Sequence, residues 1–239
     1  MLQAFYNAAL GAQQQMQRMN VQGNNISNVN TYGYKGEKPA FGVLMHGMVN
    51  GIDGAELPKG AGALMASAAT DFGDAAVMET GRSQDYAIIG EGFFALYEPA
   101  TGEISFTRDG SFTLTSYEQD KDGGVVWYLS DGEGRQVLNT GGYPIVVEDQ
   151  EAVQPVGVFT IQYKDGLLHA GSGRFVATAG SGATYAGTSE VRQGFLESSN
   201  VDLAAELGKV IEAQRSYSYA LKMVATADEV ETTVNNLTN

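Results

Sequence analysis

The sequence predicts an α+β fold in which long N- and C-terminal helices form a coiled coil and a mainly antiparallel β body is inserted between them. Apolar residues recur at helical spacing in the first 30 and the last 40 residues. In between, the spacing changes to two, and glycine-rich turns follow one another too closely to leave room for crossover helices. The expected order is therefore helix, β body, helix.

The N-terminal helix is expected within residues 1–34. Small or flexible residues occupy one a/d grid, while glutamine and asparagine fill the other faces. Because so thin a seam buries little surface, the helix needs partner helices. The seam stops before Asn30 and Gly33, either of which can take the left-handed conformation that ends a helix. The grid consists of Leu2, Phe5, Ala9, Ala12, Met16, Met19, Gly23 and Ile26.

The C-terminal helix is expected within residues 199–239. Asp202, or Ser199 together with Asp202 three residues later, can cap its start. No proline interrupts it, and about 35 residues at 1.5 Å each give a length on the order of 50 Å, too long for an ordinary packing helix. Its seam runs through Leu203, Leu207, Val210, Tyr217, Leu221 and Val224, with Gln214 as the polar member, and after a shortened step through Ala227, Val230, Val234 and Leu237.

The β body is expected over residues 84–198. Its strands are predicted from period-two alternation between turns such as RDGS and KDGG. Residues 35–83 are expected to form an extended connector, because the stretch from residue 50 onward shows no clear period. The predicted strands are Tyr86–Ile89, Phe93–Tyr97, Ile104–Arg108, Ser111–Thr115, Val125–Leu129, Tyr143–Val147 and Val156–Tyr163.

The net charge of −14 is concentrated in the middle of the chain. Residues 51–200 carry eight basic and 21 acidic side chains, whereas residues 1–50 carry three and one, and residues 201–239 three and six. No basic stripe exists to neutralise phosphates, which argues against nucleic acid binding. We interpret the acidity as a source of solubility rather than as a partner site.

Cysteine is absent, which excludes disulfides, thiolate metal sites and thiol nucleophiles. The first residues carry no basic n-region and no unbroken apolar core, so a cleaved secretory signal is not expected. No run of apolar residues is long enough for a membrane span.

Signatures of catalysis are scarce, so no catalytic residue, cofactor or metal is expected. The two histidines, His46 and His169, lie far apart and are interpreted as surface or turn residues. Asp120–Gly123 begins like a calcium loop, but its glycine comes too early and no suitable glutamate follows, which favours a hairpin turn. GEGFF lacks the third glycine of a dinucleotide fingerprint and does not open a helix.

The stretch NNISNVNTYGYK, from Asn24 to Lys35, crowds asparagines at the end of the first helix. One asparagine would suffice to end a helix. The helix end therefore does not explain Asn24, Asn25 and Asn28, and each has an amide that can hydrogen-bond a neighbouring backbone. A packed polar interface explains these amides better than open solvent does.

This stretch resembles the N-terminal signature of the flagellar rod and hook (axial) protein family, whose pattern is Asn-Asn-Leu-Ala-Asn-x-x-Thr-x-Gly-Phe/Tyr-Lys. Ile26 and Ser27 depart from it mildly. QGFLESSNVDLAAEL with QRSY resembles the family's C-terminal block, and DYAIIGEGFFAL with SFTRDGSFTL resembles the core of its β domain. Three blocks in the right order make the resemblance specific.

The resemblance implies two sets of functional positions. Those of the assembly interface are Asn24, Asn25, Asn28, Asn30, Thr31, Gly33, Tyr34, Lys35, Gln193, Gly194, Glu197, Asn200, Val201, Glu206, Gln214, Arg215 and Tyr217. Those of the structural β-domain motif are Gly90, Gly92, Phe93, Phe94, Thr107, Arg108, Asp109 and Gly110.

The resemblance further implies a non-enzymatic subunit of the basal-body rod in the cell envelope. In this family the terminal helices, the axial core domain, line a tubular filament, the β domain faces outward, and the subunits leave the cell unfolded through the flagellar export apparatus. Expected partners are copies of the chain and other axial proteins, and contact with rings around the rod is left open. Hook subunits are usually longer, so rod is favoured over hook, and the distal-rod type over the proximal type.

Two other classes of function are kept open. The first is a hook-type, other axial or non-flagellar fibre subunit, which would assemble through the same coiled-coil pairing of its terminal helices. A wall-cleaving, rod-associated enzyme is disfavoured, because no separate domain with a hydrolase motif is visible.

Overall fold

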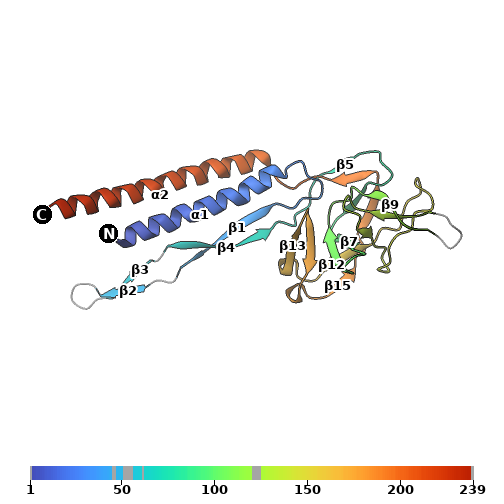
Figure 1. The fold of residues 1–239 in the computed structure, drawn as a ribbon, viewed down its shortest axis with the longest axis horizontal. Coiled ribbons are helices and arrows are strands. Elements are labelled where there is room, and N and C mark those ends of the chain that lie inside the picture. Colours follow the sequence, from blue (N-terminus) through green and yellow to red (C-terminus); the bar gives the residue numbers. More distant parts are fainter. Residues whose placement is uncertain (1, 45–46, 51–55, 61, 120–124, 238–239) are drawn as a thin grey trace. The chain divides into compact units, whose positions relative to one another are not determined.

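The computed structural model describes residues 2–44, 47–50, 56–60, 62–119 and 125–237, and these form two compact units (Figure 1). The first unit is made of Met1–Ser27, Glu37–Asp71 and Val201–Asn239. The second is made of Asn28–Gly36 and Phe72–Asn200. Each unit therefore contains segments that are far apart in the sequence.

Two antiparallel helices, α1 (Leu2–Ser27) and α2 (Leu203–Leu237), lie side by side in the first unit (Figure 1). The predicted cap of α2 is confirmed, because Asp202 Oδ1 accepts hydrogen bonds from the N–H groups of Ala204 (2.9 Å) and Ala205 (3.2 Å). The described helices contain no segment that could cross a lipid bilayer.

A β ribbon completes the first unit. Strand β1 (Glu37–Val43) pairs antiparallel with β4 (Ala63–Thr70), and β2 (Gly47–Asn50) pairs with β3 (Glu56–Lys59). The β1 and β4 strands contact α1. Most of the β4 side chains are exposed on both faces, which explains why the sequence of this segment shows no period of two.

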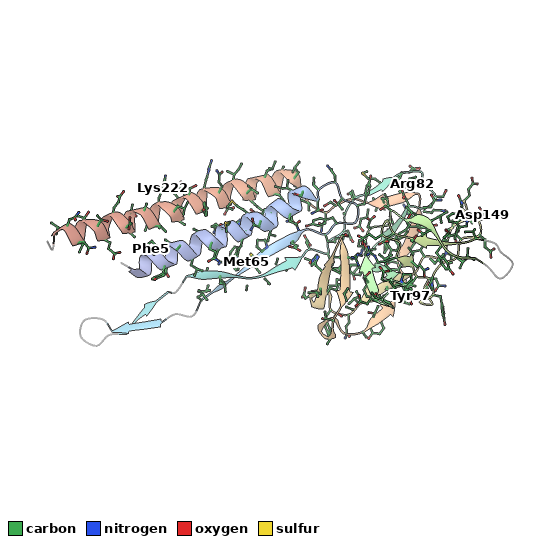
Figure 2. The ribbon with its side chains drawn as sticks, in the orientation of Figure 1. Phe5, Met65, Arg82, Tyr97, Asp149 and Lys222 are labelled. Carbon is green, nitrogen blue, oxygen red and sulfur yellow. The ribbon has the colours of Figure 1, made fainter. Side chains whose placement is uncertain are left out.

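The glutamine-rich side of α1 is partly buried, which the sequence pattern did not predict. Gln14 and Gln22 are buried, whereas Phe5 and Met16 of the expected seam are exposed. Strand β4 contributes to this burial, because the Met65 N–H donates to Gln14 Oε1 at 2.6 Å. Figure 2 shows Met65 on β4 beside α1.

The expected seam of α2 is also only partly covered. Val210, Tyr217 and Val224 are half-buried and Ala213 is fully buried, but several large apolar side chains remain exposed. Figure 2 shows Lys222 on the side of α2 away from α1. The exposed apolar side chains of α2 are Leu203, Leu207, Ile211, Tyr219, Leu221, Met223, Val230, Val234 and Leu237.

The second unit is built around an antiparallel sheet, which confirms the predicted β body. The main path of the sheet runs β13-β14-β8-β7-β11-β10-β9, and β12 pairs with β7 and β15. The strands are β7 (Phe93–Tyr97), β8 (Ile104–Thr107), β9 (Thr113–Gln119), β10 (Val125–Ser130), β11 (Gln136–Val137), β12 (Val158–Ile161), β13 (Leu167–Gly171), β14 (Arg174–Ala177) and β15 (Thr184–Ala186).

Two further strand pairs and two short 3₁₀ helices complete the second unit. β6 (Tyr86–Ile89) pairs with β16 (Glu190–Gln193), and β5 (Val77–Glu79) with β17 (Phe195–Glu197). The 3₁₀ helices are η2 (Lys164–Gly166) and η3 (Ala179–Ser181). The strand predicted at Tyr143–Val147 is present only as isolated bridges of Pro144 and Val146; proline has no N–H to donate to a ladder.

Apolar side chains on the sheet form two buried clusters. One includes Tyr86, Phe94 and Phe112, and the other includes Phe93 and Phe175. The hairpin turn predicted at residues 120–123, and His46, lie outside the described residues. His169 lies on β13 and is exposed, with its ring against that of Phe175.

Candidate functional site

A buried ion cluster in the second unit joins residues from all three of the sequence blocks. Lys35 Nζ lies 2.7 Å from Glu197 Oε1, and Arg108 Nη1 lies 3.0 Å from Glu197 Oε2. All three side chains are at most 4% exposed. We call Lys35, Arg108 and Glu197 the Glu197 cluster. Its two cations share one carboxylate, so their remaining donors need other acceptors.

Backbone carbonyls accept from two of those donors, whereas Arg108 Nε is buried without a hydrogen-bond partner among the described residues. Lys35 Nζ donates to the Gly73 carbonyl at 2.7 Å, and Arg108 Nη2 donates to the Gly90 carbonyl at 2.7 Å. The Arg108 guanidinium also lies 5.7 Å from the centre of the Phe93 ring, within cation–π range. The cluster thus ties two loops of the unit to the chain segments around Lys35 and Glu197.

The turn before Lys35 is locked to the same cluster. The Gly33 N–H donates to the Glu197 carbonyl at 2.8 Å, and Gly33 has φ of 64°. A Cβ at this position would overlap the backbone of Arg108. Glycine is therefore required twice, once for the left-handed backbone and once for the close approach. Of the two residues predicted to end the helix in a left-handed conformation, Gly33 is left-handed, but α1 ends at Ser27, so Gly33 belongs to the following turn rather than to the helix end.

Asn200 joins the same turn from the C-terminal block. Its Oδ1 accepts from the Gly36 N–H at 2.8 Å, and its own N–H donates to the Tyr34 carbonyl at 3.4 Å. The side chain therefore completes the backbone hydrogen bonding of a turn that has no strand partner. Gln193 and Gly194 serve a similar role nearby, donating to the carbonyls of Ser83 and Asp85, respectively.

The other residues of the β-domain motif shape the backbone and the apolar clusters of the second unit. Gly110 and Gly92 stand where a Cβ would meet the Tyr86 carbonyl and Val158, and Phe93 and Phe94 enter the two apolar clusters. The remaining members form a turn: Thr107 Oγ1 accepts from the Asp109 N–H, and Asp109 Oδ1 accepts from the Ser111 N–H.

A second polar cluster lies in the first unit, around Asn25. Asn25 pairs with the backbone of Glu37 on β1 through both amide atoms, Nδ2 to the carbonyl at 2.8 Å and Oδ1 from the N–H at 2.9 Å. Asn25 Nδ2 also reaches Glu206 Oε2 on α2 at 3.4 Å, and Lys209 binds the other oxygen of Glu206. Asn25 and Glu206 are both buried. This Asn25 cluster links α1, β1 and α2.

The other expected interface residues lie nearer the surface. Asn24, Asn30, Thr31, Gln214 and Arg215 are exposed. The remaining ones, Asn28, Val201 and Tyr217, are half-buried, and Asn28 Oδ1 accepts from Thr31 Oγ1 at 3.2 Å. The predicted interface residues thus separate into buried side chains that bind within the chain and exposed side chains at its surface.

Several members of these clusters were not singled out from the sequence. Lys209 and the backbone of Glu37 complete the Asn25 cluster, and the Gly73 carbonyl completes the Glu197 cluster. Arg108 and Glu197 were both singled out, but for different roles. No local signal pairs them, because they are 89 positions apart in the chain.

Charged side chains line a polar cavity in the second unit. Asp131, Glu133, Arg135 and Arg174 line a cavity of about 230 Å³. The Arg135 side chain donates to Glu133 Oε2 and, with Ser172 and the charge of Arg174, lowers the pKa of Glu133 to about 2. Among the described residues, no group of three His, Asp or Glu side chains is arranged to hold a metal ion.

Comparison with known proteins matches both ends of the chain. A family model described as "Flagella basal body rod protein" matches residues 5–35, and one described as "Flagellar basal body rod FlgEFG protein C-terminal" matches residues 192–237. These segments contain Asn25, Lys35, Glu197 and Glu206 of the two clusters.

Curated relatives match along nearly the whole chain. The flagellar basal-body rod protein FlgG of Bacillus subtilis is 30% identical over 266 residues, covering 99% of each chain. FlgG of Agrobacterium fabrum is 30% identical over 264 residues and 98% of each chain. FlgF of Mesorhizobium japonicum is 29% identical over 250 residues, covering 96% of this chain and 95% of that protein. The expected resemblance to rod proteins of the distal-rod type is confirmed.

Proposed function

The chain belongs to the flagellar basal-body rod protein family, so it is a structural, non-enzymatic protein of the flagellar basal body, and we propose that it self-assembles helically through its terminal helices into the rod. In this proposal α1 and α2 pair as a coiled coil and contact the helices of neighbouring copies. Other axial proteins extend the shaft, and the subunit reaches it through the flagellar export apparatus.

The observation that carries the proposal is the distribution of apolar side chains around α2. Successive residues of a helix are about 100° apart, and Ala213, Ala220 and Ala227 form a line of buried and half-buried side chains along α2. Exposed apolar side chains form two stripes on opposite sides of this line. The first stripe is Leu203, Leu207 and Leu221, and the second is Tyr219, Met223, Val230 and Val234.

A helix with apolar residues on several sides is normally covered on those sides. One partner, α1, cannot cover both stripes, so the pattern fits a helix surrounded by copies of itself. The exposed interface residues Gln214 and Arg215 lie on the same helix and would contribute at the rim of such contacts. The amides of Asn24 and Asn30 would do the same on the N-terminal side.

A charge placed in each stripe tests the proposal. Leu221→Asp in the first stripe and Met223→Asp in the second should each abolish motility and shorten the rod in electron micrographs of basal bodies, when expressed in a strain lacking this gene. Ser218→Asp adds the same charge at an exposed polar position of α2 and is the matched control. If both stripe variants support full-length rods, the helices do not form the contacts and the proposal fails.

A further inference from the structure

We propose that Glu206, acting through Asn25, sets the register in which α1 and α2 pair. This goes beyond helical self-assembly, because it concerns which residues of the two helices face each other within one chain. The proposal begins from an alanine repeat. Ala213, Ala220 and Ala227 recur every seven residues along the buried side of α2, and Glu206, which contacts Asn25 of α1, occupies the preceding position of the same repeat.

The alanine repeat by itself leaves the register open. When one helix shifts by seven residues, alanine replaces alanine along this line, and on the neighbouring half-buried line Tyr217 takes the place of Val210 or Val224, so the seam stays apolar. The opposing side of α1 does little to distinguish one register from another, because its buried apolar member is Ala12 and its other members are small or flexible. A shift of this kind moves one helix by about 10 Å along the other.

Glu206 makes the observed register more favourable than one shifted by seven residues. It is 7% exposed, accepts from Asn25 Nδ2 and binds Lys209 through its other oxygen. After a shift of seven residues, the N–H of Asn25 that reaches Glu206 would face the methyl group of Ala213. Losing the acceptor of a buried donor would disfavour the shifted pair by roughly 5- to 150-fold. A shift in the other direction would carry Asn25 beyond the start of α2 at Leu203.

A further polar contact between the helices, that of Arg18 with Glu212, is poorly suited to this task. Arg18 and Glu212 meet at 3.2 Å, but the Glu212 side chain is 65% exposed. Exposed ion pairs contribute little, since water competes for both charges. A single polar residue buried in an otherwise apolar seam is the feature that specifies register in coiled coils.

The absence of cysteine from the chain makes a direct test straightforward. Spin labels are attached at Gln13→Cys on α1 and Glu229→Cys on α2, both exposed positions offset along the helix axes, and the distance between them is measured by pulsed electron paramagnetic resonance. The spin-labelled protein with no further substitution should give one narrow distance distribution. Glu206→Ala extends the alanine repeat and should add a second distance that differs by up to about 10 Å.

Two variants act as controls. Glu206→Gln keeps an oxygen that accepts from Asn25, and Glu212→Ala removes the exposed pair, so both should retain the single distance. The proposal is overturned if Glu206→Ala keeps one distance with its helical circular dichroism intact, or if Glu212→Ala gains a second distance. Loss of helix in Glu206→Ala, or a broad distribution in the unsubstituted background, would also overturn it, because Glu206 would then not be selecting between registers. Because all readouts concern one chain, the result is independent of whether rods form.

Discussion

The ammonium of Lys35 lies 2.7 Å from the carboxylate of Glu197, although the two residues are 162 positions apart in the chain, and both side chains are almost completely buried. Arg108 binds the second carboxylate oxygen. One side chain therefore connects the end of the N-terminal signature, the β body and the start of the C-terminal block. The stability of the second unit should depend strongly on it.

Glu197→Gln should destabilise the second unit by about 3–5 kcal/mol, because it leaves two buried cations without their counter-charge. The measurement is urea unfolding followed by the fluorescence of Trp127, the one tryptophan of the chain, which lies on β10 in this unit. Glu190→Gln is the control, since its partner Arg192 and Glu190 are both more than half exposed. The control should change stability by less than about 1 kcal/mol. Equal midpoints for the two variants would contradict the importance of the Glu197 cluster.

Gly33→Ala should also destabilise the second unit, by more than the cost of left-handed backbone alone. That cost is roughly 1–2 kcal/mol for a non-glycine residue, and at Gly33 the added Cβ would in addition collide with the Arg108 backbone. Gly102→Ala is matched for strain, because Gly102 has φ of 75° and nothing within 4 Å of an added Cβ. The same unfolding experiment separates the two effects. A loss no greater than in Gly102→Ala would show that the turn can move away from Arg108.

The pKa of Glu133 makes a prediction about acid stability. Because the hydrogen bond from Arg135 lowers the folded-state pKa from 4.5 to about 2, the carboxylate favours the folded state above pH 4.5. This contribution is lost as the pH falls from about 4.5 toward 2. Glu133 is half exposed, so the effect on stability is small, and the titration itself is the better readout.

Carbon-detected nuclear magnetic resonance of the Glu133 carboxyl should show its midpoint near pH 2. Arg135→Met should move that midpoint toward 4.5, because it removes the main donor. Arg192→Met removes a guanidinium that binds Glu190 instead and should leave the midpoint unchanged. A midpoint near 4.5 in the unsubstituted chain would rule out the hydrogen bond between Arg135 and Glu133.

The raised pKa of Tyr86 predicts a loss of stability at alkaline pH. Burial raises the pKa of its phenol above 10, while hydrogen bonds from the Gln154 N–H and Gln193 oppose the rise. The neutral phenol therefore favours the folded state fully below pH 10, and this contribution is lost as the pH rises further. Tyr86→Phe should flatten the fall in stability above pH 10, as measured by urea unfolding at a series of pH values. If Tyr86→Phe lost stability above pH 10 as steeply as the unsubstituted chain, the loss would be due to groups other than Tyr86.

The elements of the fold follow largely from local pattern. The start of α2 at Leu203 was predicted because Asp202 can cap it, and β6 and β7 were predicted at their observed bounds because buried strands alternate with glycine turns. The ribbon of β1 and β4 gave no such signal. Its exposed strands lack an apolar face, so neither period was available to detect.

The sequence alone determined the helices, most strands of the β body and the positions at which polar residues gather. Only the tertiary structure decided what those residues do: Lys35, Arg108 and Glu197 meet within one unit, and Asn25 meets Glu206 across two helices. Secondary structure depends on neighbours a few residues apart, whose spacing can be read directly. A contact across 89 to 181 residues depends on how whole elements pack, and no spacing in the chain records it.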